Sequence, residues 1–133
     1  MHIRNIVAAA ALAAACGSSA IARPANPESD LAKTLEGRVA GAPVDCIFLH
    51  TIRSSRIIDH TAIVYDSGRT IYVNRPTTGA DSLSKWDVML EKPTNSRLCS
   101  IDVVRLYDQS TRFPKGFVGL GKFVPYTKVS VRD

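Results

Sequence analysis

The sequence predicts a mainly β domain of the small α+β class, built as an antiparallel meander sheet or a partly open barrel with one or two short helices. From Val44 onward the chain consists of short runs of β-branched and aromatic residues. Turn-forming residues at positions 53–56 and 66–69 separate these runs. A single short helical pattern precedes the first run, which leaves helix as the minor component.

The first predicted element is a short helix that begins at Asn26. Asn26 suits the N-cap, and Pro27 suits the first helical position because its missing N–H would have no partner there. Leu31 and Leu35 lie four residues apart, so they share one face of the helix. Gly37 ends it. We expect this helix to pack one apolar stripe against the domain.

A three-stranded meander is expected over about residues 44–74. Its predicted strands are residues 44–52, 57–65 and 70–74. With Ser67 and Gly68 as a two-residue loop, Val64 would lie opposite Ile71, and Asp66 and Arg69 would flank the turn as an ion pair. Both faces of this hairpin are largely apolar, so we expect it to be central and covered on both sides.

The remaining segments predict a second helical turn and two more strands. Asp81 suits an N-cap before a turn that carries Leu83 and Trp86. Residues 99–107 are rich in Ile, Val and Leu and predict a strand. Residues 116–124 alternate glycine with apolar residues and predict the last strand.

The length and the charge limit the function classes. The 133 residues make one domain, and 45% hydrophobic with 22% charged residues excludes a wholly disordered chain. Seventeen basic and twelve acidic residues give a net charge of +5, spread along the chain without a basic run or an RNA-binding aromatic signature. We therefore expect no nucleic-acid partner. An anionic surface or an envelope partner suits this charge better.

Residues 1–22 are predicted to be a signal peptide. Arg4 precedes an apolar stretch at positions 6–15, which is too short to span a bilayer. Ala20 and Ala22 give the small-x-small pattern that signal peptidase accepts, with cleavage before Arg23. Residues 23–30 then form a linker and the helix start, and residues 31–133 form a single β-rich domain in the periplasm or outside the cell.

Cys16 leaves a second form of export open. Residues 12–16 resemble a bacterial lipobox, although Leu12 lies one place further from Cys16 than is usual. Lipidation of Cys16 would anchor the protein to the membrane surface without a spanning helix. We expect membrane contact only in this lipid-anchored form.

The other two cysteines are predicted to form a disulfide. Cys46 and Cys99 are the pair that remains after export into an oxidising compartment. The alternative is two buried free thiols. No C-x-x-C pair is present, and His50 and His60 are the only imidazoles left after export, so we expect no metal site and no cofactor.

One pair of residues suggests catalysis. If residues 53–56 close a simple hairpin, His50 faces Asp59, and the carboxylate would orient the imidazole as a general base. Asp102 would approach the pair if the disulfide draws its strand close. The alternative is a polar cross-strand pair on a solvated face, because no nucleophile accompanies it. The aromatic residues are expected in the core, with a ligand groove as the alternative: Phe48, Tyr65, Tyr72 and Trp86.

Four short motifs resemble a family of small proteobacterial envelope proteins, secreted or lipid-anchored, of unknown function. They are the Cys-Ile step at residues 46–47, Ile-Asp at 58–59, Tyr-Val-Asn at 72–74 and Leu-Cys-Ser-Ile-Asp at 98–102. The resemblance covers about residues 44–106. Where the family has a second Asp after the Ile-Asp step, this chain has His60. The resemblance implies export and assigns no catalytic residue.

Three function classes follow from these observations. The first is a non-enzymatic binding or structural module of the envelope. The second is a small periplasmic hydrolase that uses His50 and Asp59. The third is a small-molecule or lipid-binding β domain. An exposed apolar patch would favour the first, an assembled His–Asp cleft the second and an enclosed apolar cavity the third.

Overall fold

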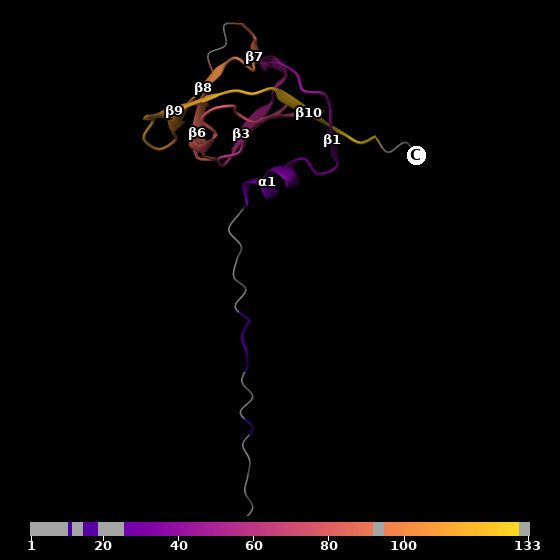
Figure 1. The fold of residues 1–133 in the computed structure, drawn as a ribbon, viewed down its shortest axis with the longest axis vertical. Helices are drawn as coiled ribbons and strands as arrows, with labels where there is room; N and C mark the ends of the chain where they lie inside the picture. The colour runs from indigo at the N-terminus through magenta and orange to yellow at the C-terminus, as the bar shows by residue number, and fades with distance from the viewer. Residues whose placement is uncertain (1–10, 12–14, 19–25, 92–94, 131–133) are drawn as a thin grey trace, which may run out of the picture.

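The computed structural model describes residues 11, 15–18, 26–91 and 95–130 (Figure 1). It confirms a mainly β fold with one α-helix and ten antiparallel strands, which form no closed barrel within the described chain. The strand orders of the three sheets are β1-β10-β5-β4-β3, β2-β7 and β6-β8-β9. The elements are α1 (Pro27–Thr34), β1 (Arg38–Ala40), β2 (Cys46–Phe48), η1 (Leu49–Thr51), β3 (Ser54–Ile58), β4 (Ala62–Asp66), β5 (Thr70–Asn74), η2 (Ala80–Ser82), β6 (Asp87–Leu90), β7 (Arg97–Cys99), β8 (Val103–Asp108), β9 (Pro114–Gly119) and β10 (Phe123–Lys128).

The predicted helix is confirmed as α1, which lies along one side of the domain (Figure 1). Asn26 caps it: the Glu28 backbone N–H donates to Asn26 Oδ1 at 3.0 Å. Leu31 is buried against the sheet. Arg75, just after β5, forms a two-pronged ion pair with Glu28 at 2.8 and 3.0 Å. Both side chains are exposed, so burial of Leu31 contributes more to docking than this pair does.

The meander is present, but its first strand is not the predicted one. Strands β3, β4 and β5 form it, and β3 occupies most of the stretch that was expected to be a loop. The turn between β3 and β4 lies at residues 59–61 instead. The prediction was wrong because residues 54–56, expected to be a loop, pair with β4, and the chain turns inside the run that was predicted to be one strand over residues 57–65.

The β4–β5 register differs from the predicted one by one residue on each strand. Gly68 and Arg69 form the two-residue loop, and the Ser67 N–H donates to the Thr70 carbonyl at 3.0 Å. Gly68 has φ 91°, which suits the first position of such a turn. Asp66 accepts a hydrogen bond from the Gly68 N–H and does not form the expected pair with Arg69.

The predicted faces of this hairpin are confirmed despite the shift, because a shift by one residue on each strand keeps the alternation of faces. Two apolar clusters lie on opposite sides of it. One lies beneath α1 and contains Leu31, Ile58, Ala62, Val64, Ile71 and Val73. The other joins the hairpin to the remaining two sheets and contains Ile47, Ile57, Ile63, Tyr65, Leu83, Leu98, Val104, Leu106, Val118, Leu120 and Phe123.

Two predicted strands in the C-terminal half are each divided in the structure. Residues 99–107 contain the end of β7, a turn at residues 100–102 and most of β8. Residues 116–124 contain the end of β9, a crossing at residues 120–122 and the start of β10 in another sheet. The buried Asn74 fixes this crossing: its Nδ2 donates to the Gly121 carbonyl at 2.7 Å and its Oδ1 accepts from the Gly121 N–H at 2.9 Å.

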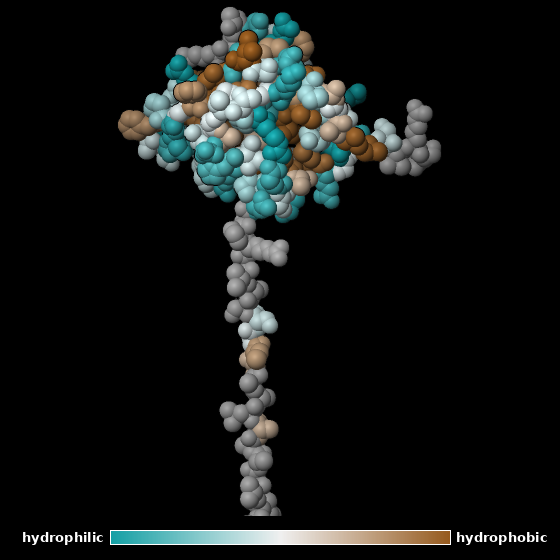
Figure 2. All heavy atoms as spheres, viewed as in Figure 1, coloured by the Kyte–Doolittle hydropathy of each residue, from teal (hydrophilic) through white to brown (hydrophobic). Residues whose placement is uncertain are grey.

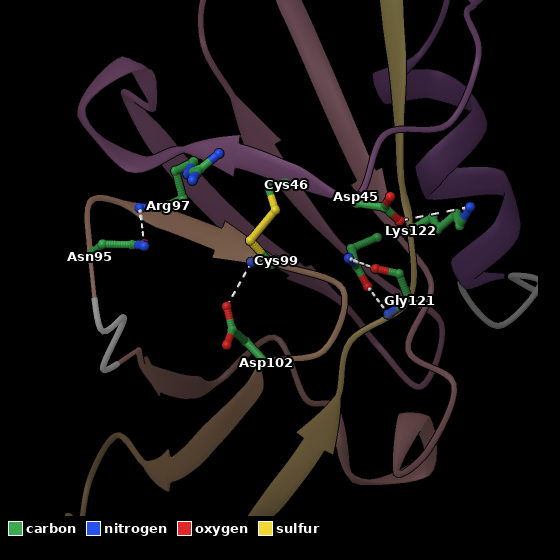
Figure 3. Close-up of a disulfide and its surroundings, with 9 residues drawn as sticks. Asp45, Cys46, Asn95, Arg97, Cys99, Asp102, Gly121 and Lys122 are labelled. Atoms are coloured by element: carbon green, nitrogen blue, oxygen red, sulfur yellow. Dashed lines mark hydrogen bonds and ion pairs between the residues drawn. A yellow bond between two sulfur atoms is a disulfide. The ribbon is translucent and has the colours of Figure 1, made fainter.

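The predicted Cys46–Cys99 disulfide is confirmed (Figure 3). The two cysteines are directly opposite each other in the β2–β7 ladder, with Cα atoms 4.0 Å apart. The expectation that this bond would curl the meander toward closure was wrong. Strands β2 and β7 form a separate two-stranded sheet, so the bond joins neither to the meander.

Replacing Cys46 and Cys99 together by Ala should lower the free energy of unfolding by about 2–5 kcal/mol. The bond closes a long loop, with a sequence separation of 53 residues, and its loss would enlarge the unfolded ensemble. Urea titration of both proteins measures the difference. Reductant should destabilise the wild type and leave the double variant unchanged. Two reactive thiols in the denatured, non-reduced pair would contradict the bond.

Candidate functional site

The predicted pairing of His50 with Asp59 is wrong. His50 lies in η1 and is exposed, with its ring 5.7 Å from the ring of Phe48. Asp59 lies in the turn after β3, where its Oδ1 accepts a hydrogen bond from the Lys85 N–H at 2.6 Å. The hairpin that would have placed these side chains opposite each other does not form, because β3 begins at Ser54.

Asp102 has a structural contact. Its Oδ2 accepts a hydrogen bond from the Cys99 N–H at 2.7 Å, and its own N–H donates to the Cys99 carbonyl at 2.9 Å. Figure 3 shows its carboxylate directed at the Cys99 backbone. These bonds close the turn between β7 and β8. The structure therefore does not bring Asp102, His50 and Asp59 together as a catalytic group.

Cys16 lies in a short described stretch and is an exposed free cysteine. Most of the predicted signal peptide, including the cleavage point before Arg23, lies outside the described residues. No helix in the described residues is long and apolar enough to cross a membrane.

The prediction that the four aromatic residues lie in the core is confirmed for two of them. Tyr65 is buried and Tyr72 packs partly buried against the same cluster. Trp86 is 67% exposed and Phe48 is also exposed, so the prediction was wrong for both. The helical turn expected to carry Trp86 is η2, which ends at Ser82 and buries Leu83 directly after it.

The outer face of the β6-β8-β9 sheet carries an open apolar groove that the sequence did not reveal. We call it the outer groove; its volume is about 660 Å³. It is lined by Leu90, Val103, Arg105, Leu106, Tyr107, Pro114, Gly116 and Phe117. Figure 2 shows hydrophobic residues exposed among hydrophilic ones over β8 and β9.

Strand alternation produces this face. In β8, Val104 and Leu106 are fully buried, whereas Val103 is 50% exposed on the other side. In β9, Val118 is buried and Phe117 is 61% exposed. The alternation of residues 103–107 was the signal available in the sequence. Val103 and Tyr107 on the outer side are apolar or aromatic as well, so this alternation alone did not show which face of the strand would be covered.

A bulge in β9 shapes one end of the outer groove. Leu106 lies opposite Gly116 and Tyr107 opposite Pro114, so Lys115 is the extra residue. Gly116 has φ 134°, which favours glycine and leaves the groove without a side chain there. Lys115 reaches Asp87 on β6 at 2.9 Å. Its pKa is raised chiefly by this hydrogen bond.

The charged side chains along this face are basic. Arg105 is the charged residue of the outer groove, and Arg112 lines an adjoining hollow of about 200 Å³ together with Val88, Leu90 and Tyr107. In the part of the chain that the structure describes, no acidic residue lines either hollow. The face therefore combines apolar surface with two guanidinium groups, which suits a ligand that is apolar and carries a negative charge.

A second titratable pair lies in the core, outside this groove. The buried Tyr65 hydroxyl donates to Glu91 Oε1 at 2.9 Å. Burial raises the pKa of Tyr65 well above its ordinary value, and the Glu91 charge adds to this. Burial also raises the pKa of Glu91, while the hydrogen bond from Tyr65 opposes that shift. Among the described residues, no group of three or more His, Cys, Asp or Glu side chains is placed to hold a metal ion.

Glu91→Gln should remove a pH dependence of stability. The folded state holds the Glu91 proton more tightly than the unfolded chain does, because the pKa of Glu91 is raised on folding. Protonated Glu91 therefore contributes fully to the free energy of unfolding below about pH 4.5, and this contribution is lost as the pH rises above that value. The wild type should therefore lose stability relative to the variant between about pH 4 and about pH 7. Urea midpoints at both pH values test this, and an unchanged difference would contradict it.

Comparison of the chain with protein-family models, with curated protein sequences and with solved structures gave no match.

Proposed function

We propose that this protein is a non-enzymatic binding module exported to the cell envelope and that the outer groove is its ligand site. The observation that carries the proposal is the open apolar hollow of about 660 Å³ on a sheet face that no other described element covers. Its volume lies within the range of about 300–1,000 Å³ that small-molecule sites occupy. Exposed apolar surface of this kind costs solubility, which favours a binding role over a purely structural one.

The lining supports an anionic amphiphile as the ligand, meaning an acyl chain with a negatively charged head group. Val103 and Phe117 offer apolar contact to the chain. The Arg105 guanidinium offers charge-assisted hydrogen bonds to a carboxylate or phosphate. This combination joins the first and third function classes that the sequence left open.

The hydrolase alternative has less support. His50 and Asp59 lie in different segments, and each has its own neighbour, Phe48 for His50 and the Lys85 backbone for Asp59. A general base also needs a nucleophile or a positioned water within hydrogen-bond reach. Among the described residues that line the outer groove there is no such pair of side chains: the polar ones are Arg105 and Tyr107.

Export by residues 1–22 is part of the proposal, and mass spectrometry of the protein from a bacterial envelope fraction tests it. We expect either a chain that begins at Arg23 or a chain that begins at a diacylglycerol-modified Cys16. The second form would hold the outer groove near membrane lipids. A mature protein that keeps Met1 would contradict both forms.

Titration of the purified protein with monomeric dodecanoate tests the ligand class. We expect saturable binding that Phe117→Ser and Arg105→Gln each weaken about tenfold, since one removes apolar contact and the other the cation. The uncharged dodecyl maltoside should bind more weakly. Parallel titration with phosphatidylglycerol and phosphatidylcholine vesicles shows whether the source is a free amphiphile or a membrane.

Phe48→Ser and Arg97→Gln are the matched controls, because Phe48 and Arg97 are exposed on the separate β2-β7 sheet. Both should bind dodecanoate like the wild type. Absence of saturable binding to either dodecanoate or vesicles, or equal binding by all four variants, would contradict the proposal.

A further inference from the structure

A second open feature of the fold is the outer edge of β3. β3 is the last strand of the five-stranded sheet, with β4 on its inner side, and no other described strand pairs with it. Alternate residues of an edge strand direct their N–H and C=O groups away from the sheet. Such a row of backbone groups pairs with another extended chain unless something covers it.

A groove of about 650 Å³ runs along this edge; we call it the edge groove. Residues 55–58 of β3 form its floor. Asp30, Lys33 and Thr34 of α1 form one wall, and Asp87 and Met89 of β6 lie on the other. The edge groove is distinct from the outer groove, because the two share no lining residue.

The α1 and β6 walls of the edge groove limit the shape of the ligand that it can bind. Each residue of an extended chain covers about 3.3 Å, so the four floor residues accompany about 13 Å of a bound strand. A groove that has a helix on one side and a strand on the other along this length suits a single extended chain. A whole folded sheet would meet both walls.

The lining combines apolar side chains with charged side chains of both signs. Lys33, Arg56 and Lys85 supply positive charge, and Asp30 and Asp59 supply negative charge. Asp87 adds another carboxylate, whose side chain is 1% exposed. Its Oδ1 accepts from Lys115, and its Oδ2 has no hydrogen-bond partner among the described residues. The lining therefore has one carboxylate oxygen without a partner, together with apolar and charged surface, which suits a polypeptide that carries hydrogen-bond donors and mixed side chains.

We infer that the edge groove binds an extended polypeptide segment of a partner, which adds as a sixth strand beside β3. Backbone hydrogen bonds to the open edge supply the affinity in this mode of recognition, and alternate side chains meet the two walls. This gives the module a second, protein-directed site that is independent of the proposed amphiphile site.

The test is selection of a displayed library of random ten-residue peptides on the purified protein. Enriched peptides should bind the wild type and lose at least tenfold in affinity with Ser55→Trp, because Ser55 is exposed on the groove floor and indole would fill it. Ser54→Trp is the matched control: Ser54 is also exposed on β3 but does not line the edge groove. It should bind the peptides like the wild type.

N-methylation of alternate peptide backbone nitrogens gives the second readout. It should abolish binding in one of the two alternating registers, since only one register donates to β3. Ser55→Trp should keep the wild-type urea midpoint and the wild-type dodecanoate affinity, which separates this site from the outer groove. The inference would be overturned if no peptide were enriched or if N-methylation left binding unchanged. It would also be overturned if Phe117→Ser abolished peptide binding and Ser55→Trp did not.

Discussion

The burial of the β4–β5 hairpin on both faces is the constraint on which the rest of the structure depends. Ala62, Ile63, Val64 and Tyr65 are consecutive and all buried, so neither side of the strand faces water. Each large apolar side chain contributes about 1.5–3 kcal/mol when it is fully buried. Helix α1 therefore covers one face, and the β6-β8-β9 and β2-β7 sheets cover the other.

This layering places the two candidate sites. The β6-β8-β9 sheet uses its inner residues to cover the hairpin, and its outer face has no further layer in the described chain. The five-stranded sheet ends at β3, where α1 and β6 stand on either side of an open edge. The outer groove thus lies on a sheet face without a further described layer, and the edge groove lies along the open edge of a sheet. They differ in chemistry: the outer groove is apolar and basic, and the edge groove combines apolar surface with charges of both signs.

Local patterns in the sequence predicted the helix, the faces of the hairpin and the disulfide. The cap at Asn26 and the alternation in β4 are properties of neighbouring residues, so they are visible without the fold. The breaks within residues 99–107 and 116–124 were not visible. Asp102 closes the first through a side-chain bond, and Asn74 fixes the second from 47 positions away in the chain. The edge groove joins residues of α1, β3 and β6, which are far apart in the sequence, so no local pattern indicated it. The outer groove joins residues of β6, β8 and β9, and only the alternation in β8 was visible locally.

The measurement that tests the central claim most directly is a map of backbone amide chemical shifts as dodecanoate is added to the ¹⁵N-labelled protein. A binding site on the outer face of the β6-β8-β9 sheet predicts that the amide chemical shifts change along β6, β8 and β9 and stay constant in α1 and β3. Changes that concentrate on α1 and β3, or that spread evenly over all the sheets, would contradict the assignment of the outer groove as the ligand site.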